Sequence, residues 1–310
     1  MLAGMGTVDE RAIDAASGQR GLATRAQLIE AGVSVSTITR RLGKKRWSEV
    51  VPGVVDLGTH EPDGRGRLQQ LLLAAGSESW ASHWSAAHLH RFLDVDEPAS
   101  PDVLVRRGRY PWVDSLALHT TTAIDADETT AVAGLRCTTR ARTLLDLSPQ
   151  LGLEAIERFA ADLARRDREA FRQLGILLAR YPAASGRRRL LTALARLPGD
   201  VAELGSALEA FFAAVFRREG APTPKLQYRV RDLGGALLKR VDFAWPDEWT
   251  IAEIDGVAWH GTSSAQRRDS EVRAHMRELG WTVEVFRYAD LDGPRPAQLA
   301  ARLRALRSDR

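Results

Sequence analysis

Four side chains that can do chemistry lie in one short stretch near the end of the sequence: Asp242, Glu253, Asp255 and His260. Carboxylates held close together repel one another unless a proton or a cation lies among them. Mg²⁺ takes oxygen ligands, commonly one or two carboxylates completed by water and phosphate oxygens. A histidine beside such an ion can act as a general base. These residues therefore predict a Mg²⁺-assisted site for phosphodiester cleavage, for which Mn²⁺ would be a substitute.

A β-hairpin must bring these residues together. Two short apolar runs, 241–243 and 250–254, flank Asp247-Glu248, which is typical of two strands and a turn. Glu253 and Asp255 share one face of the second strand, and Asp242 joins them only if the register allows it. The alternative to a metal site remains open. In that case the carboxylates only line a hairpin edge or pair with arginines, and His260 is an ordinary loop histidine.

Further elements are predicted around this hairpin. Apolar residues over 208–216 form a helix face that would pack on a sheet, and 266–279 is a polar, arginine-rich helix. The first strand of the hairpin is predicted to span 237–243, further strands are predicted at 226–230 and 282–286, and a closing helix at 296–306.

These motifs carry a resemblance. The pattern Val-Asp-Phe-x-Trp-Pro, then Glu-x-Asp-Gly-x-x-Trp-His, then Arg268-Asp269, then Gly280-Trp281, resembles the very-short-patch-repair endonucleases. They form a branch of the PD-(D/E)xK nuclease superfamily, and the resemblance covers roughly 206–306. It implies a restriction-endonuclease-like α/β/α core with a mixed sheet. It also implies the following roles: metal ligands Asp242 and Glu253, a third acid Asp255, a catalytic His260, auxiliary acids Glu209 and Asp269, and phosphate contacts from Arg267 and Arg268. Asp255 stands where many relatives carry lysine, and Arg273 where many carry an acid.

The N-terminal residues predict a DNA-binding unit. Thr24 and Gln27 have capping-box spacing, Gly32 ends that helix, and Ser34 or Ser36 caps a second one. A hairpin over 47–57 follows. A helix-turn-helix with such a wing is the winged-helix plan, whose second helix enters the major groove. The predicted DNA contacts are Thr37, Thr39, Arg40, Arg41, Lys44, Lys45 and Arg46. The alternative is a solvated face of a small protein-interaction domain.

A second resemblance concerns this half of the chain. The blocks 21–28, 51–55, 82–87 and 138–147 resemble AbiEi-type antitoxins. That family implies a winged-helix regulator of its own operon, paired with a nucleotidyltransferase-like toxin. Two functions are therefore carried forward. One is a toxin–antitoxin or defence protein with a metal-dependent DNA endonuclease domain. The other is a non-catalytic antitoxin and autorepressor whose C-terminal domain only binds DNA or a toxin.

The middle of the chain gives weaker signals. His83, His88 and His90 suggest a metal site, but on a helix 88 lies off the face that 83 and 90 share, so structural histidines are favoured. Arg140 and Arg142 are expected to pair with Asp146 rather than contact phosphate. The single cysteine, Cys137, is expected to be a buried structural thiol. The triplet 187–189 is expected to be a solvated helix start rather than a nucleic-acid contact.

Composition limits the class of protein. The chain has 310 residues, 44% hydrophobic and 27% charged, which suits several soluble domains. We expect a multidomain α+β / α/β protein: a winged helix at 1–60, a mixed domain at 61–150, a helical connector at 151–203 and the endonuclease-like domain at 204–310. A net charge of +4 permits DNA binding. The lone cysteine, the polar start and the lack of a long apolar run predict a cytoplasmic protein without a membrane span. The oligomeric state is left open.

Overall fold

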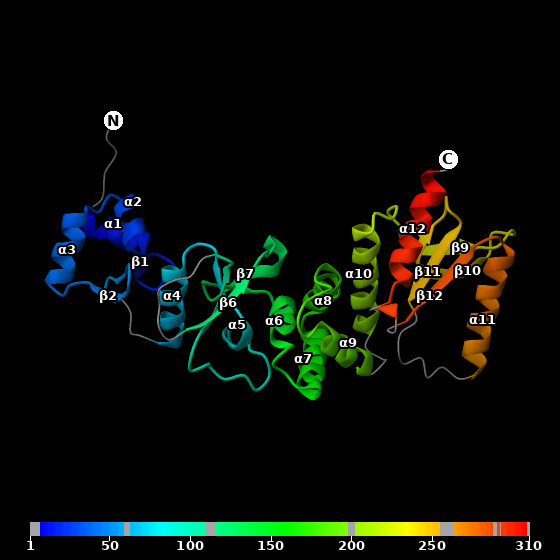
Figure 1. Cartoon of the computed structure of the whole chain (residues 1–310), viewed down its shortest axis with the longest axis horizontal. Helices are drawn as coiled ribbons and strands as arrows, with labels where there is room; N and C mark the ends of the chain where they lie inside the picture. The colour runs from blue at the N-terminus through cyan, green and yellow to red at the C-terminus, as the bar shows by residue number, and fades with distance from the viewer. Residues whose placement is uncertain are drawn as a thin grey trace. The chain divides into compact units, whose positions relative to one another are not determined.

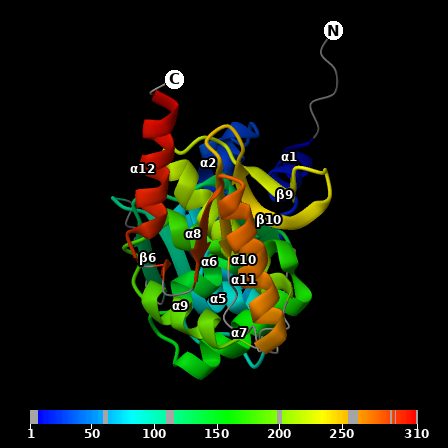
Figure 2. The same cartoon turned by 90° about the vertical axis from the view of Figure 1, so that its right-hand side faces the viewer.

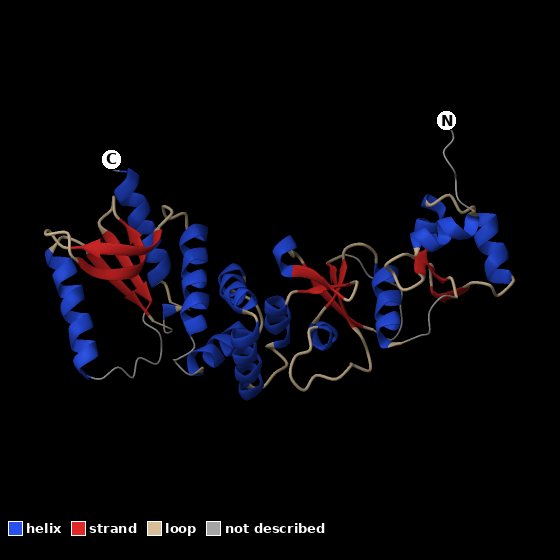
Figure 3. Cartoon of the chain, turned by 180° about the vertical axis from the view of Figure 1, so that it is seen from behind, coloured by secondary structure: helices blue, strands red, loops and turns tan. Residues whose placement is uncertain are grey.

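The computed structural model describes residues 7–58, 63–108, 116–197, 202–254, 263–287, 290–291 and 293–308. Within residues 202–205 and 263–266 it describes the backbone alone. The chain divides into two compact units, residues 1–146 and 147–310. Helices and strands both occur in each unit (Figure 3). The predicted mixed α+β, multi-unit architecture is therefore confirmed.

The first part of unit 1 is a small helical layer with a three-stranded sheet. Its elements in chain order are α1 (Val8–Ala15), β1 (Leu22–Thr24), α2 (Arg25–Glu30), α3 (Val35–Gly43), β2 (Ser48–Val51) and β3 (Val54–Asp56). The sheet is antiparallel with order β1-β3-β2. Thr24 forms the predicted capping box with Gln27, and Ser34 caps α3. The two predicted helices and the hairpin are confirmed, whereas α1 and β1 were not predicted.

The second part of unit 1 is a five-stranded mixed sheet with helices. Its elements are α4 (Gly64–Ala75), β4 (Ser79–Ala81), α5 (His83–Leu89), β5 (Asp102–Arg106), β6 (Ala117–Thr121), the 3₁₀ turn η1 (Ala126–Glu128), β7 (Thr129–Val132), β8 (Leu135–Thr138) and α6 (Arg140–Leu147). The order is β6-β5-β4-β8-β7, with β5 parallel to β6 and β4 parallel to β8. Leu71, Val103 and Leu135 lie in its buried core.

Unit 2 begins with a helical block. Its helices are α7 (Leu153–Arg166), α8 (Arg168–Arg180) and α9 (Arg187–Arg196), which lie within the segment 151–203 that was predicted to be helical. Helix α8 packs closely on α10 (Ala202–Arg218) at Gly175. A Cβ there would lie 2.0 Å from the Ala207 carbonyl oxygen, so only glycine permits this approach.

A four-stranded mixed sheet completes unit 2. The remaining elements are β9 (Lys225–Arg231), β10 (Leu237–Trp245), β11 (Thr250–Ile254), α11 (Ser263–Glu278), β12 (Thr282–Phe286) and α12 (Arg295–Ser308). The order is β12-β11-β10-β9, with β11 and β12 parallel and the other pairs antiparallel. Helix α11 lies on one side of the sheet, and α10 and α12 lie on the other (Figure 1). Figure 2 shows β9 and β10 as a long curved ribbon.

Apolar side chains fix this three-layer arrangement. Phe216 of α10 packs edge-on against Phe243 and Trp245 of β10, with ring centroids 5.6 and 5.2 Å apart. Met276 of α11 packs with Ile251 on the other side. In the part of the chain that the structure describes, we find no helix with the length and apolar character needed to cross a bilayer.

The arginine triplet at the start of α9 differs from the prediction. Arg187 is 8% exposed, and its guanidinium donates to the carbonyl oxygens of Leu178 and Leu291 at 2.9 and 3.2 Å. Arg189 donates to the carbonyl oxygen of Leu151 at 2.9 Å. The expectation of a solvated helix start is therefore wrong for Arg187, whereas Arg188 and Arg189 are exposed. Backbone carbonyls without helix or sheet partners accept the hydrogen bonds of Arg187 and Arg189.

Substitution of Arg187 tests whether its buried hydrogen bonds stabilise the fold. Arg187→Ala should lower the free energy of unfolding by about 2–4 kcal/mol, because buried carbonyls would lose their donors. Arg188→Ala, which changes an exposed neighbour, should stay within about 0.5 kcal/mol of the parent. Urea unfolding followed by tryptophan fluorescence measures both. Equal losses for the two variants would contradict a structural role specific to Arg187.

Candidate active site and nucleic-acid interface

The predicted hairpin around Asp242 is present. Strands β10 and β11 are antiparallel, and their pairing ends with Phe243 opposite Ala252, the residues next to Asp242 and Glu253. At this position Asp242 Oδ2 accepts a hydrogen bond from the Ile254 backbone amide at 2.8 Å. The carboxylate is therefore held against the strand that carries Glu253.

The backbone is irregular at Asp242. Val241 belongs to the apolar cluster that contains Met276 of α11, whereas Phe243 packs against Phe216 of α10. Residues two apart in a regular strand share a face, so the alternation breaks between them. Gln227 lies across from this break and has a φ of 50°, in the left-handed region. Such irregularities redirect side chains and are frequent next to active sites.

Glu209 of α10 lies beside Asp242. The Gln227 side-chain amide Nε2 is 3.3 Å from both Glu209 Oε2 and Asp242 Oδ1. Burial raises the pKa of Asp242, and the charge of Glu253 raises it further. Burial and the charge of Asp242 likewise raise the pKa of Glu209. The two carboxyl groups therefore compete for one donor and repel each other, an arrangement that a cation would relieve.

This repulsion predicts a pH-dependent stability effect. Because the pKa of Glu209 is higher folded than unfolded, its ionisation costs stability as pH rises through the folded pKa, and the cost is absent in acid. In chelator-containing buffer, Glu209→Gln should therefore raise the free energy of unfolding at neutral pH by about 0.5–2 kcal/mol. Urea titrations across pH measure this, with Glu271→Gln, at an exposed position of α11, as the matched control. A gain that is equal in acid and at neutral pH would contradict the charge explanation.

Glu253 lies in an ion-pair network. It is 3% exposed. Lys239 Nζ lies 2.7 Å from its Oε1, and Arg273 Nε lies 2.5 Å from its Oε2. The same two cations reach Asp269 of α11, at 2.5 and 2.8 Å. Glu253 Oε1 is buried and accepts no hydrogen bond of good geometry from the described residues, so the Lys239 contact is an ion pair alone.

The structure thus brings the described acids of the site together in two pairs. Glu209 lies with Asp242, and Asp269 is linked to Glu253 through Lys239 and Arg273. Lys239 was missed from the sequence, because only the strand pairing brings it to Glu253. Asp255 and His260 lie outside the described residues.

The donor set fits a hard divalent cation. Carboxylate oxygens are the ligands that Mg²⁺ and Mn²⁺ prefer. Each carboxylate oxygen accepts two hydrogen bonds or contacts, so those of Asp242 and Glu209 have capacity beyond the contacts with Gln227 and Ile254 that the described residues supply. Both oxygens of Glu253 already contact cations, and among the described residues Glu209, Asp242 and Glu253 do not place three ligand atoms within 4.8 Å of one another.

Helix α3 presents a basic surface in unit 1. Of the residues predicted to contact DNA, those that are exposed are Thr39 and Arg40 on α3, and Lys44, Lys45 and Arg46 directly after it. Ile38 on the opposite side of α3 is buried in the core with Leu28. Exposed cationic side chains therefore lie on and directly after a helix whose other face packs in the core.

Two predicted contacts of α3 have structural roles. Arg41 pairs with Asp9 at 2.5 Å and lies over the Trp47 ring at 5.6 Å. Thr37 donates its amide to the Ser34 side chain as part of the helix cap, at 3.2 Å. These contacts stabilise α3 itself. In unit 2, the predicted contacts Arg267 and Arg268 are exposed on α11.

The predictions for the middle of the chain are confirmed in several respects. Arg142 Nε donates to Asp146 at 2.9 Å, and its Nη1 donates to buried Glu128. Arg140 instead donates to the His90 carbonyl oxygen at 3.0 Å. Cys137 is buried, and burial raises the pKa of its thiol to about 12. His90 Nε2 lies 2.7 Å from the Thr138 carbonyl oxygen, a structural contact.

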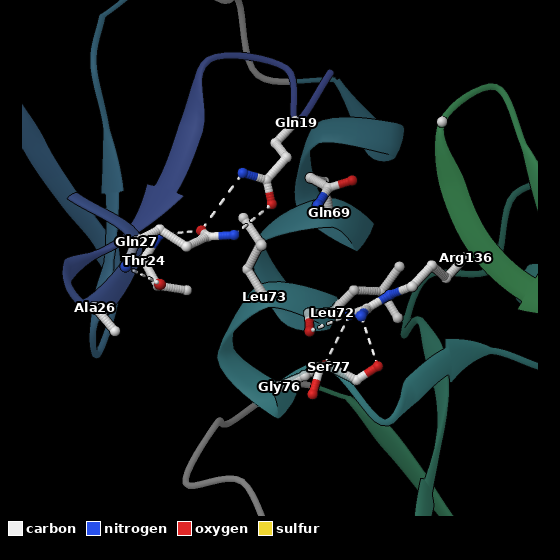
Figure 4. Close-up of a pocket in the computed structure, with 11 residues that line it drawn as sticks. Gln19, Thr24, Ala26, Gln27, Gln69, Leu72, Leu73, Gly76, Ser77 and Arg136 are labelled. Carbon is white, nitrogen blue, oxygen red and sulfur yellow. Dashed lines mark hydrogen bonds between the residues drawn. The ribbon is translucent and has the colours of Figure 1, made fainter. Parts of the chain in front are cut away.

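A cleft of about 490 Å³ in unit 1 is shown in Figure 4. Its polar lining groups bond to one another. Gln19 and Gln27 exchange hydrogen bonds, and the Arg136 guanidinium donates to the carbonyl oxygens of Ser77 and Gly76 at 2.6 and 2.7 Å. Arg136 therefore caps the C-terminal end of α4, and we assign no ligand to this cleft.

Comparisons with known proteins place the chain among relatives. No family model matches it. Two proteins of Mycobacterium tuberculosis, the uncharacterized proteins MT2308 (strain CDC 1551 / Oshkosh) and Rv2248 (strain ATCC 25618 / H37Rv), are each 31% identical over 247 residues. Each alignment covers 78% of this chain and 86% of the relative. A crystal structure of the RV2827C protein from M. tuberculosis matches with a TM-score of 0.40 and 14% identity, covering 74% of this chain and 90% of that one.

The alignment with each of the two uncharacterized proteins covers most of this chain and most of the relative, and the identity is high enough to assign them to one family. This chain therefore belongs to the same protein family as the uncharacterized proteins MT2308 and Rv2248 of M. tuberculosis.

Proposed function

We propose that the protein binds DNA through α3 and cuts it at a divalent-cation site in unit 2. The carrying observation is the half-buried pair Glu209 and Asp242, which share the Gln227 amide and have raised pKa values. Groups with pKa values shifted by burial and a like charge are candidates for functional sites.

The element order supports this proposal. The sequence α1, β1, α2, α3, β2, β3, with an antiparallel sheet, fits the winged-helix plan. In unit 2 the mixed four-stranded sheet between α11 and α10 fits the α/β/α core that the endonuclease resemblance implies. The acids Glu209, Asp242, Glu253 and Asp269 all come from this sheet and its two flanking helices.

The residues divide the work as follows. Glu209, Asp242 and Glu253 would hold Mg²⁺ or Mn²⁺, which when bound polarises the phosphate and acidifies a water. Gln227 and the Ile254 amide orient Asp242. Lys239 and Arg273 orient Glu253, and their positive charge also attracts the phosphate backbone. Arg267 and Arg268 supply further phosphate contacts. Asp255 and His260 stay proposed as the third acid and the general base.

A cleavage assay tests the enzymatic proposal. Purified full-length protein should nick DNA when Mg²⁺ or Mn²⁺ is added and should stop when a chelator removes the ion. Single-stranded, duplex and mismatched substrates, compared in one titration, reveal the preferred substrate. Cleavage that continues at the same rate in chelator overturns the cation site.

A second function is favoured by the ion pairs of Glu253. Both its oxygens contact cations of the chain, and such neutralised carboxylates are also found in purely structural sites. In this alternative the protein is a non-catalytic antitoxin and repressor of its own operon. Its C-terminal unit would bind DNA or a nucleotidyltransferase-like toxin. Co-purification with such a toxin, together with operator binding and no cleavage, would select this alternative.

A further inference from the structure

A cluster of two histidines and one carboxylate lies in unit 1, far along the chain from the acids of unit 2. His119 of β6 has its Nε2 2.8 Å from Asp102 Oδ1 of β5. The ring of His83, the first residue of α5, stacks on the His119 ring with centroids 3.6 Å apart. One ligand atom from each of the three residues lies within 4.8 Å of the other two.

The surroundings hold these side chains in place. The Asp102 backbone amide donates to Ser85 Oγ of α5 at 2.8 Å, and the carboxylate is buried. His83 Nδ1 lies 3.0 Å from Ser82 Oγ, and His83 has a φ of 44°. That left-handed conformation is uncommon for histidine and fixes the direction of its ring. Both rings are half-buried, so one side of the cluster faces solvent.

Ligand chemistry distinguishes this cluster from the acids of unit 2. Imidazole nitrogens suit Zn²⁺, Co²⁺ and Ni²⁺, whereas carboxylate-only sets suit Mg²⁺ and Mn²⁺. Burial lowers the pKa of His83 to about 4, so at neutral pH its ring is the neutral form that binds metal. A second ring nitrogen bonded to a neighbouring group is typical of ligating histidines, and Ser82 supplies that group for His83.

We propose that His83, Asp102 and His119 bind a divalent transition-metal ion of the zinc class and thereby clamp α5 to β5 and β6. Bonds of about 2.0–2.1 Å place tetrahedral ligands about 3.4 Å apart. Small side-chain rotations therefore bring the present spacing to the bound one. The ion would take the place of the proton in the His119–Asp102 hydrogen bond, and that proton would move to His119 Nδ1 or to water.

Cobalt provides the direct test. Full-length protein stripped with chelator and then given Co²⁺ should show visible d–d absorption that Zn²⁺ abolishes. His119→Gln should remove this absorption, and so should His83→Asn, in which asparagine tolerates the left-handed backbone. His88→Gln, on the same helix, should keep it. Saturating Zn²⁺ should raise the melting temperature of the parent by roughly 5–10 °C and leave the two site variants unchanged.

The outcomes are distinguishable from those of the cleavage site. A Glu209→Gln, Asp242→Asn chain should bind Co²⁺ as the parent does, and His83→Asn should keep Mg²⁺-dependent cleavage. Circular dichroism verifies that each variant is folded. If His119→Gln unfolds, the Co²⁺ absorption of His83→Asn alone tests whether the metal site exists. Absence of Co²⁺ absorption in the parent, or equal absorption in His83→Asn, overturns the metal clamp and leaves a histidine–aspartate pair with a stacked ring.

Discussion

Replacing Asp242 by alanine is expected to lower Mg²⁺- or Mn²⁺-dependent DNA cleavage by at least about 10²-fold. Loss of a group that merely orients a metal ligand costs 10–100-fold, and loss of a ligand itself should cost no less. Asp242 is also the acid whose position is fixed from two directions, by the Ile254 amide and by Gln227. Initial nicking rates of parent and variant at several ion concentrations measure the effect.

The control must remove an acid without touching the site. Glu271 is exposed on α11, so Glu271→Gln should cleave at the parental rate. Asp242→Asn keeps an oxygen for the Ile254 amide but loses the charge, so it should resemble Asp242→Ala in rate and the parent in fold. A folded Asp242→Ala chain that nicks at the parental rate sinks the enzymatic proposal and leaves the repressor alternative.

Lys239 offers a way to separate the two functions. In the enzymatic proposal the positive charge of Lys239 attracts the phosphate backbone of DNA. In the alternative this charge only neutralises the buried carboxylate of Glu253. Both proposals agree that removing one partner of a buried ion pair destabilises the fold. They differ in the expected rate of DNA cleavage. Only in the enzymatic proposal does removal of Lys239 lower the cleavage rate of the molecules that stay folded. Cleavage therefore has to be normalised to folded protein.

The elements of unit 2 were predictable because their patterns are local. Alternating apolar residues and a turn gave β10 and β11, and a 3.6-residue period gave α10 and α11. The break at Asp242 was not predictable. It depends on the left-handed Gln227 of a neighbouring strand, and no residue at 242 itself signals it. For the same reason Lys239 escaped notice, since its partner is 14 positions away and meets it through strand pairing.

The histidines show the same limit. Spacing within one helix argued against a site made of His83, His88 and His90, and His90 indeed bonds to a backbone carbonyl. The sheet instead supplies Asp102 and His119 to His83 from two parallel strands. Helical periodicity describes one element at a time, so a cluster assembled from three elements needs the tertiary fold.

The basic stretch of unit 1 shows where composition misleads. The sequence grouped Arg40 and Arg41 as equal DNA contacts, yet they point to different environments. Arg41 lies between Asp9 and the Trp47 ring, whereas Arg40 is exposed. Adjacent helical residues differ by 100° in direction, so one neighbour can support the fold while the other meets a ligand.

Replacing both Arg40 and Lys44 by alanine is expected to weaken DNA binding and to reduce its salt dependence. These exposed residues lie four apart at the end of α3, on one helical face. Each lost phosphate contact changes the slope of log K against log salt by about 0.9 on duplex DNA, so the double variant should lose about 1.8. Fluorescence anisotropy with labelled duplex at several salt concentrations measures both the affinity and the slope.

Two comparisons make this result specific to α3. Arg65→Ala with Arg107→Ala removes the same charge from exposed positions elsewhere in unit 1, so it should keep most of the slope. Arg41→Ala should act through stability, because it breaks the Asp9 and Trp47 contacts, and its binding loss should track the unfolded fraction. If the Arg65, Arg107 variant loses as much slope as the Arg40, Lys44 variant, binding is a net-charge effect. DNA docking on α3 would then be rejected, because a helix that inserts into a groove makes contacts that charges elsewhere on the unit cannot replace.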